Sequence, residues 1–61
     1  SLQEIIRLKK EIQKLSDKIE TMQRQIRREP QLNRQMAMNG EARAMKQQLA
    51  ELKKELDKWN T

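Results

Sequence analysis

Four arginines beside the only proline are the side chains best suited to bind another molecule: Arg24, Arg27, Arg28 and Arg34. Each guanidinium is a planar fork of donors that fits phosphate and carboxylate groups. The surrounding residues 23–46 hold six of the 14 basic groups but only two of the nine acidic groups. The cluster could therefore bind the phosphates of RNA or an acidic protein surface, but no aromatic residue lies nearby to stack on a base. An ordinary solvated helix face is the favoured interpretation.

Side chains for catalysis are scarce. The chain has no His and no Cys, so the usual zinc, iron and copper ligand sets and the commonest general base are missing. Its single Gly cannot make a phosphate-binding loop. Carboxylates such as Glu51 and Glu55 are each followed three residues later by a Lys, which is typical of a salt-bridged, solvated helix. We therefore expect no enzyme activity, no cofactor and no small-molecule substrate.

A row of apolar and small residues recurs every four positions after Leu32, at Met36, Gly40 and Ala44. Residues with this spacing share one side of a helix. Glycine inside a helix costs about 1 kcal/mol relative to alanine, so Gly40 indicates either a close backbone approach or a turn that extends to residue 40. We expect Met36, Gly40 and Ala44 to form a partner-docking surface. Leu2 and Ile6 form a second, smaller patch with the same predicted role.

Helices must position these residues. The 61 residues are 34% hydrophobic and 38% charged and include no Phe or Tyr, which predicts an all-α chain without a layered core. Apolar residues in the first half alternate by three and four without a miss, as in a coiled-coil heptad. They are Ile5, Leu8, Ile12, Leu15, Ile19, Met22 and Ile26. This pattern predicts a helix over residues 2–28.

A second seam follows, out of phase with the first. Its members are Met38, Ala42, Met45, Leu49, Leu52, Leu56 and Trp59. Pro30 disfavours helical geometry at Glu29 and removes a backbone donor. One continuous coiled coil would have to absorb the phase jump at the same place. We therefore predict a turn over 29–34 and a second helix over 35–60, within a single domain that is a fragment of a longer protein.

The two predicted helices can fold back into an antiparallel coiled-coil hairpin. Pairing residues whose numbers sum to 64 gives seven apolar layers, from Ile5 with Trp59 to Ile26 with Met38. Registers shifted by a heptad are also acceptable, and this one brings Lys9 toward Lys53. A parallel homodimer is the alternative, because the first helix has Ile at every a position and Leu or Met at every d position. The hairpin is the preferred prediction.

A two-helix hairpin supplies little core for its length. We therefore expect the hairpin to self-associate into a four-helix assembly, or to pack against another part of the longer protein or against a helix of a partner. No run approaches the roughly 20 apolar residues of a membrane span. A cytoplasmic location without membrane contact is expected.

One stretch resembles a known family. It comprises Glu29-Pro30-Gln31-Leu32-Asn33-Arg34-Gln35, then Met38-Asn39-Gly40-Glu41-Ala42, then Leu49, Leu52 and Leu56. This pattern is similar to the C-terminal helical segment of the bacterial "domain of unknown function 4391" family, although Pro30 and Gly40 depart from it. The resemblance implies a bacterial accessory domain without a known activity.

A weaker resemblance is to the Rho-binding antiparallel coiled-coil repeats of protein kinase N-type effectors. It is carried by Ile26-Arg27-Arg28-Glu29 and Gly40-Glu41-Ala42, and it implies binding of a small GTPase. The leading hypothesis is a non-catalytic coiled-coil module for protein interaction or oligomerisation in a larger bacterial protein. An RNA-binding arm and a GTPase-binding repeat are its alternatives.

Overall fold

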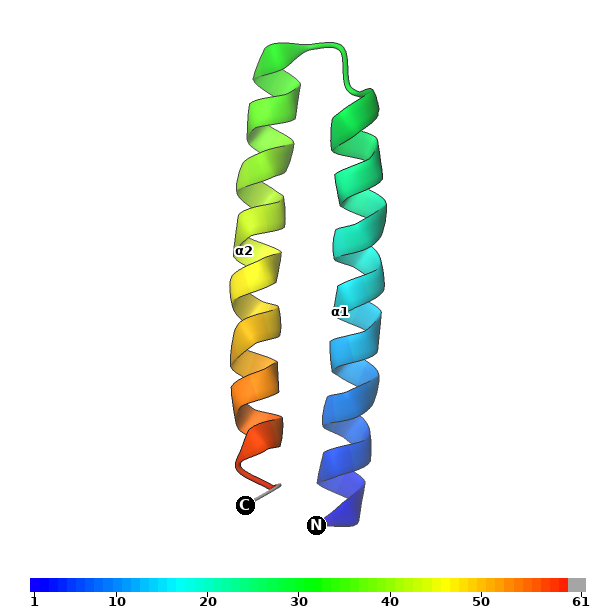
Figure 1. Cartoon of the computed structure of the whole chain (residues 1–61), viewed down its shortest axis with the longest axis vertical. Coiled ribbons are helices and arrows are strands. Elements are labelled where there is room, and N and C mark those ends of the chain that lie inside the picture. Colours follow the sequence, from blue (N-terminus) through cyan, green and yellow to red (C-terminus); the bar gives the residue numbers. More distant parts are fainter. Residues whose placement is uncertain (60–61) are drawn as a thin grey trace.

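The protein, seen in a computed structural model that describes residues 1–59, is an antiparallel helical hairpin. Helix α1 (Leu2–Arg28) and helix α2 (Leu32–Asp57) lie side by side along their whole length, with the start of α1 and the end of α2 at the same end (Figure 1). The molecule measures 46 × 14 × 12 Å. The predicted all-α hairpin is confirmed, and with it the predicted bounds of the first helix.

Helix α1 has a capped start and charged residues that suit both of its ends. The Ser1 side-chain oxygen accepts a 3.3 Å hydrogen bond from the backbone N–H of Glu4, and the Glu4 carboxylate lies in the first turn, where the helix dipole favours an acid. Arg27 and Arg28 occupy the last turn, where the dipole favours cations. The caps and the heptad seam therefore specify the same element.

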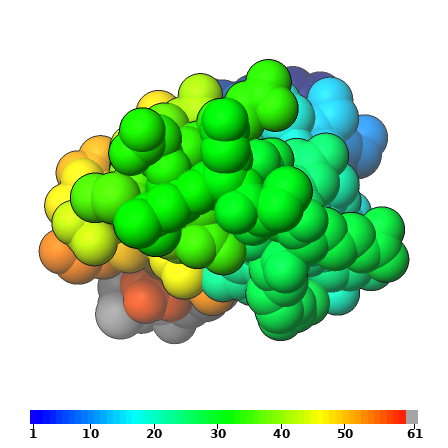
Figure 2. Space-filling model, turned by 90° about the horizontal axis from the view of Figure 1, so that it is seen from above, coloured from blue at the N-terminus to red at the C-terminus, as the bar shows by residue number. Residues whose placement is uncertain are grey.

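The connection is shorter than predicted. Glu29 is extended (φ −76°, ψ 116°), as a residue before proline should be, and its carboxylate accepts a 3.2 Å hydrogen bond from the backbone N–H of Gln31. Gln31 already caps α2, so the predicted turn over 29–34 and helix start at residue 35 are wrong by three residues. One proline breaks the helix, and nothing after it prevents helical geometry from resuming at once. Seen from the turn end, the connection and the adjoining residues cover the ends of both helices (Figure 2).

The predicted seam is the core. Leu8, Ile19, Ile26 and Ala42 are buried, and the other seam residues before Trp59 are half-buried. Trp59 is the exception, with 46% of its surface exposed. Helix α2 ends at Asp57, so the predicted layer of Ile5 with Trp59 does not form within a helix. The second helix was predicted to end at residue 60, which lies outside the described part of the chain; α2 already ends at Asp57.

Gly40 lies inside α2, and nothing comes within 4 Å of the position that its Cβ would occupy. The turn therefore does not extend to residue 40. No backbone approaches Gly40 closely within the hairpin either. The space beside Gly40 is open, so both predicted explanations of this glycine fail for the isolated chain.

Candidate interaction surfaces

A polar contact between the helices was missed by the sequence reasoning. The half-buried Gln35 side chain donates a 2.9 Å hydrogen bond to the backbone carbonyl of Ile26. The backbone N–H of Glu29 donates to the same carbonyl at 3.2 Å. Continuing the second heptad three residues back from Met38 would have placed Gln35 in the seam. The first layer beside the turn is thus polar, and it ties α2 to the last turns of α1.

Two grooves flank the seam in the half of the hairpin nearer the turn. The cationic groove is lined by Gln23, Ile26, Arg27, Met36, Asn39, Gly40, Ala42, Arg43 and Lys46. The mixed-charge groove is lined by Lys14, Asp17, Lys18, Thr21, Met22, Gln25, Glu41, Ala44, Met45 and Gln48. Each groove is lined by side chains from both α1 and α2.

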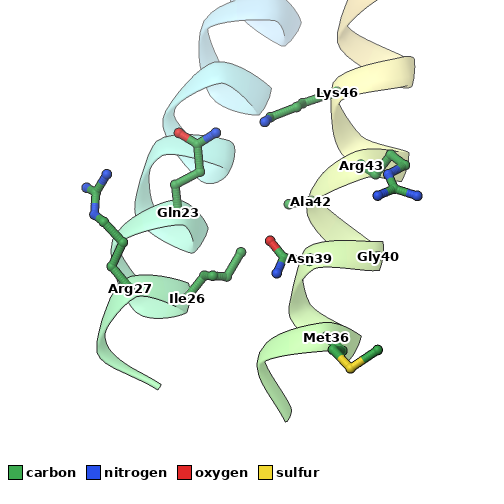
Figure 3. Close-up of a pocket in the computed structure, with 9 residues that line it drawn as sticks. All are labelled: Gln23, Ile26, Arg27, Met36, Asn39, Gly40, Ala42, Arg43 and Lys46. Carbon is green, nitrogen blue, oxygen red and sulfur yellow. The ribbon is translucent and has the colours of Figure 1, made fainter. Parts of the chain in front are cut away.

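The cationic groove has three positive side chains and no acid among its lining residues. Arg27 comes from α1, whereas Arg43 and Lys46 come from α2, and Lys46 reaches toward α1 (Figure 3). None of these three cations forms an ion pair within residues 1–59. Ile26 points from α1 toward α2, and the buried Ala42 lies on α2 farther from the turn (Figure 3). The groove therefore combines an apolar floor with uncompensated positive charge at its edges.

The mixed-charge groove differs in its charge balance. Lys14 and Lys18 on α1 are matched by Asp17 on the same helix and Glu41 on α2. Its apolar lining comes from the half-buried Met22 and Met45 and from the exposed Ala44. This groove has both signs of charge around apolar side chains, and such a surface can face a copy of itself.

The four predicted anion-binding arginines are divided between the cationic groove and the exposed surface outside both grooves. Only Arg27 lines a groove; Arg24, Arg28 and Arg34 are exposed outside both grooves. Arg24 is three and four residues from Arg27 and Arg28, so the three share the outer surface of the last turns of α1. Arg43 and Lys46 were not among the predicted site residues, yet they supply two of the three positive charges of the cationic groove.

The predicted docking row is also divided. Met36 and Gly40 line the cationic groove, whereas Ala44 lines the mixed-charge groove. Each step of four residues rotates about 40° around a helix, so the row winds across the outside of α2 from one groove to the other. Leu2 and Ile6, which were predicted to form a separate patch, are both exposed near the start of α1.

The described residues contain no cluster of three or more acidic side chains that could hold a metal ion. Within residues 1–59, neither helix has the length and apolar character needed to cross a membrane.

No family model matches this chain, and comparisons with curated proteins and with solved structures gave no match, so both family resemblances stay predictions.

Proposed function

We propose that this hairpin is a non-catalytic oligomerisation module, in which two copies pack through their mixed-charge grooves into a four-helix assembly. The observation that carries the proposal is the large surface that the single hairpin leaves exposed. Its accessible surface is 5239 Å² for a mass of 7.4 kDa. A compact monomer of that mass is expected to expose about 4200 Å².

The difference is about 1000 Å² per chain. A stable protein–protein interface buries about 800 Å² on each partner, so one dimer contact would bring the chain close to the surface of a compact protein. The core supports the same inference, because among residues 1–59 only four side chains are buried and Leu8 alone is almost fully enclosed. Helices arranged in this way gain most of their stability from further packing of their apolar faces.

Charge decides which groove faces the second copy. A two-fold contact places the same patch opposite itself, so the patch must be complementary to itself. Lys14 and Lys18 can approach Asp17 and Glu41 of a copy, whereas the cationic groove would oppose only positive charges. Ala44 adds a small side chain at the mixed-charge groove, which permits helices to approach to about 8–10 Å.

The test is the mass of the chain as a function of concentration, measured by sedimentation equilibrium. The unmodified chain should move from monomer to dimer, and Ala44→Glu should weaken dimerisation by about tenfold or more, because a larger, charged side chain would be desolvated at the position where the small Ala44 permits close approach of the helices. Gln3→Glu is the matched control: it adds the same charge at an exposed position of α1 outside both grooves.

Circular dichroism should show both variants to be as helical as the unmodified chain, since residues 3 and 44 are exposed in the hairpin. A chain that stays monomeric at all concentrations would overturn the proposal. So would an Ala44→Glu variant that dimerises as well as Gln3→Glu.

A further inference from the structure

The geometry points to the cationic groove as a docking site for an acidic amphipathic helix from another protein, which would lie along α2 between Met36 and Lys46. This inference is independent of the proposed self-association, because it uses the groove on the other flank of the seam.

Charge is the first argument. Arg27, Arg43 and Lys46 surround the groove without an acid among its lining residues and without an ion pair in the described chain. Arg43 and Lys46 are three residues apart on α2, about one turn. Acidic side chains repeating every three or four residues on a second helix have a similar spacing, so they can face these two cations in succession.

Apolar surface is the second argument. Met36 lines the groove with 63% of its surface exposed, and the side chain of methionine adapts to differently shaped partners. Gly40 lies one turn further along α2 with open space where a Cβ would stand. A helix placed beside these residues could bury Met36 and come close to the backbone at Gly40, as in helix-in-groove recognition.

The length of the groove sets the length of the partner. From Met36 to Lys46, α2 rises about 15 Å at 1.5 Å per residue. A partner helix therefore needs about three turns to contact the whole groove. Each turn would meet one distinct feature: the apolar edge at Met36, the opening at Gly40, and the cations at Arg43 and Lys46.

A helix fits these features better than nucleic acid does. The chain's only aromatic residue is Trp59, at the opposite end of α2 from Met36, so no ring beside the groove can stack on a base. Phosphates would leave the exposed Met36 without an apolar partner. Gln23 and Asn39 supply further hydrogen-bonding groups within the groove, which suit carboxylates and amides on a partner helix.

The test uses a synthetic helical peptide of three heptads, with Leu and Ala along one side and Glu at the flanking positions. Its dissociation constant for the full chain is measured by isothermal titration calorimetry. Two further peptides replace every Glu with Gln or with Lys. The acidic peptide should bind at least about tenfold more tightly than the Lys peptide, with the Gln peptide in between.

The matched variants are Arg43→Glu with Lys46→Glu, and Lys10→Glu with Lys54→Glu. Both double variants lower the net charge equally, but Lys10 and Lys54 are exposed and line neither groove. The first variant should lose about tenfold or more in affinity for the acidic peptide, and the second should change by threefold or less, because salt screens distant charges. Should the first variant lose helicity, Arg43→Gln with Lys46→Gln replaces it.

Equal affinity for the acidic and Lys peptides would overturn the inference, as would an equal loss in both double variants. A 20-nucleotide single-stranded RNA serves as the competing ligand. If it binds more tightly than the acidic peptide, and Arg43→Glu with Lys46→Glu abolishes that binding, the groove recognises nucleic acid and the inference is wrong.

Discussion

The Gln35 side-chain amide donates a 2.9 Å hydrogen bond to the backbone carbonyl of Ile26, nine residues earlier in the chain. This bond joins the first turn of α2 to the last turns of α1. The Ile26 carbonyl also accepts a hydrogen bond from the backbone N–H of Glu29, so this carbonyl keeps a partner if the glutamine is removed. The bond adds a directional contact to a seam whose apolar layers alone allow registers shifted by a heptad.

Replacing that side chain should weaken the hairpin moderately. Gln35→Ala removes one part-buried hydrogen bond, so the free energy of unfolding in urea should fall by about 1 kcal/mol. Gln47→Ala is the control, because Gln47 is an exposed glutamine of the same helix. It should be neutral or slightly stabilising, since alanine is the better helix former. Equal effects of the two substitutions would show that the Gln35 bond contributes nothing.

The burial of the seam predicts a contrast between two leucines of α1. Leu8 is 1% exposed and Leu2 is 72% exposed. Leu8→Ala should lower the free energy of unfolding by about 2 kcal/mol or more, which is enough to unfold much of so small a domain. Leu2→Ala should cost about 0.5 kcal/mol or less. Thermal unfolding followed by circular dichroism compares the two, and similar melting curves would mean that Leu8 is not packed in solution.

Gly40→Ala should stabilise the hairpin. The glycine is helical, and a Cβ there would meet nothing within 4 Å. Alanine should therefore gain about 1 kcal/mol of helix propensity without a steric cost. Urea unfolding at a concentration where the chain is monomeric measures the gain. A loss of stability instead would indicate that another part of the protein approaches this backbone closely in solution.

The hairpin topology predicts a compact particle at low concentration. The radius of gyration of its Cα atoms is 14.3 Å. A single uninterrupted helix of the same 61 residues would be about 90 Å long, with a radius of gyration of about 26 Å. Small-angle X-ray scattering extrapolated to zero concentration separates these cases. A value near 26 Å would favour the parallel homodimer of extended helices.

The heptad spacing was sufficient to predict both helices and nearly all of the core, because apolar residues that alternate by three and four all lie on one side of a helix. The errors occur where the repeat stops. The start of α2 depends on how soon helical geometry resumes after Pro30, and the position of Trp59 depends on where α2 ends. Both depend on local backbone preferences at the helix ends, and the spacing of apolar residues gives no information about these preferences.

The grooves were harder to predict than the seam. Arg43 and Lys46 become neighbours of Arg27 only when α2 lies beside α1 in the observed register. Their sequence positions give no sign of a shared site, whereas the clustered Arg24, Arg27 and Arg28 suggested one. Interaction surfaces made of two helices depend on the pairing of flanking positions, and each flanking position contributes only a few tenths of a kcal/mol to that pairing.

The two outer ends of the helices lie at the same end of the molecule (Figure 1). Tension applied to these ends would therefore act first on the apolar side chains at the open end of the hairpin, such as Leu8, and would reach those beside the turn, such as Ile26, last. The two helices would separate progressively from the open end toward the turn, and their contacts would break in succession instead of all at once. Such a geometry resists pulling weakly, so the hairpin is mechanically compliant even where its chemical stability is adequate.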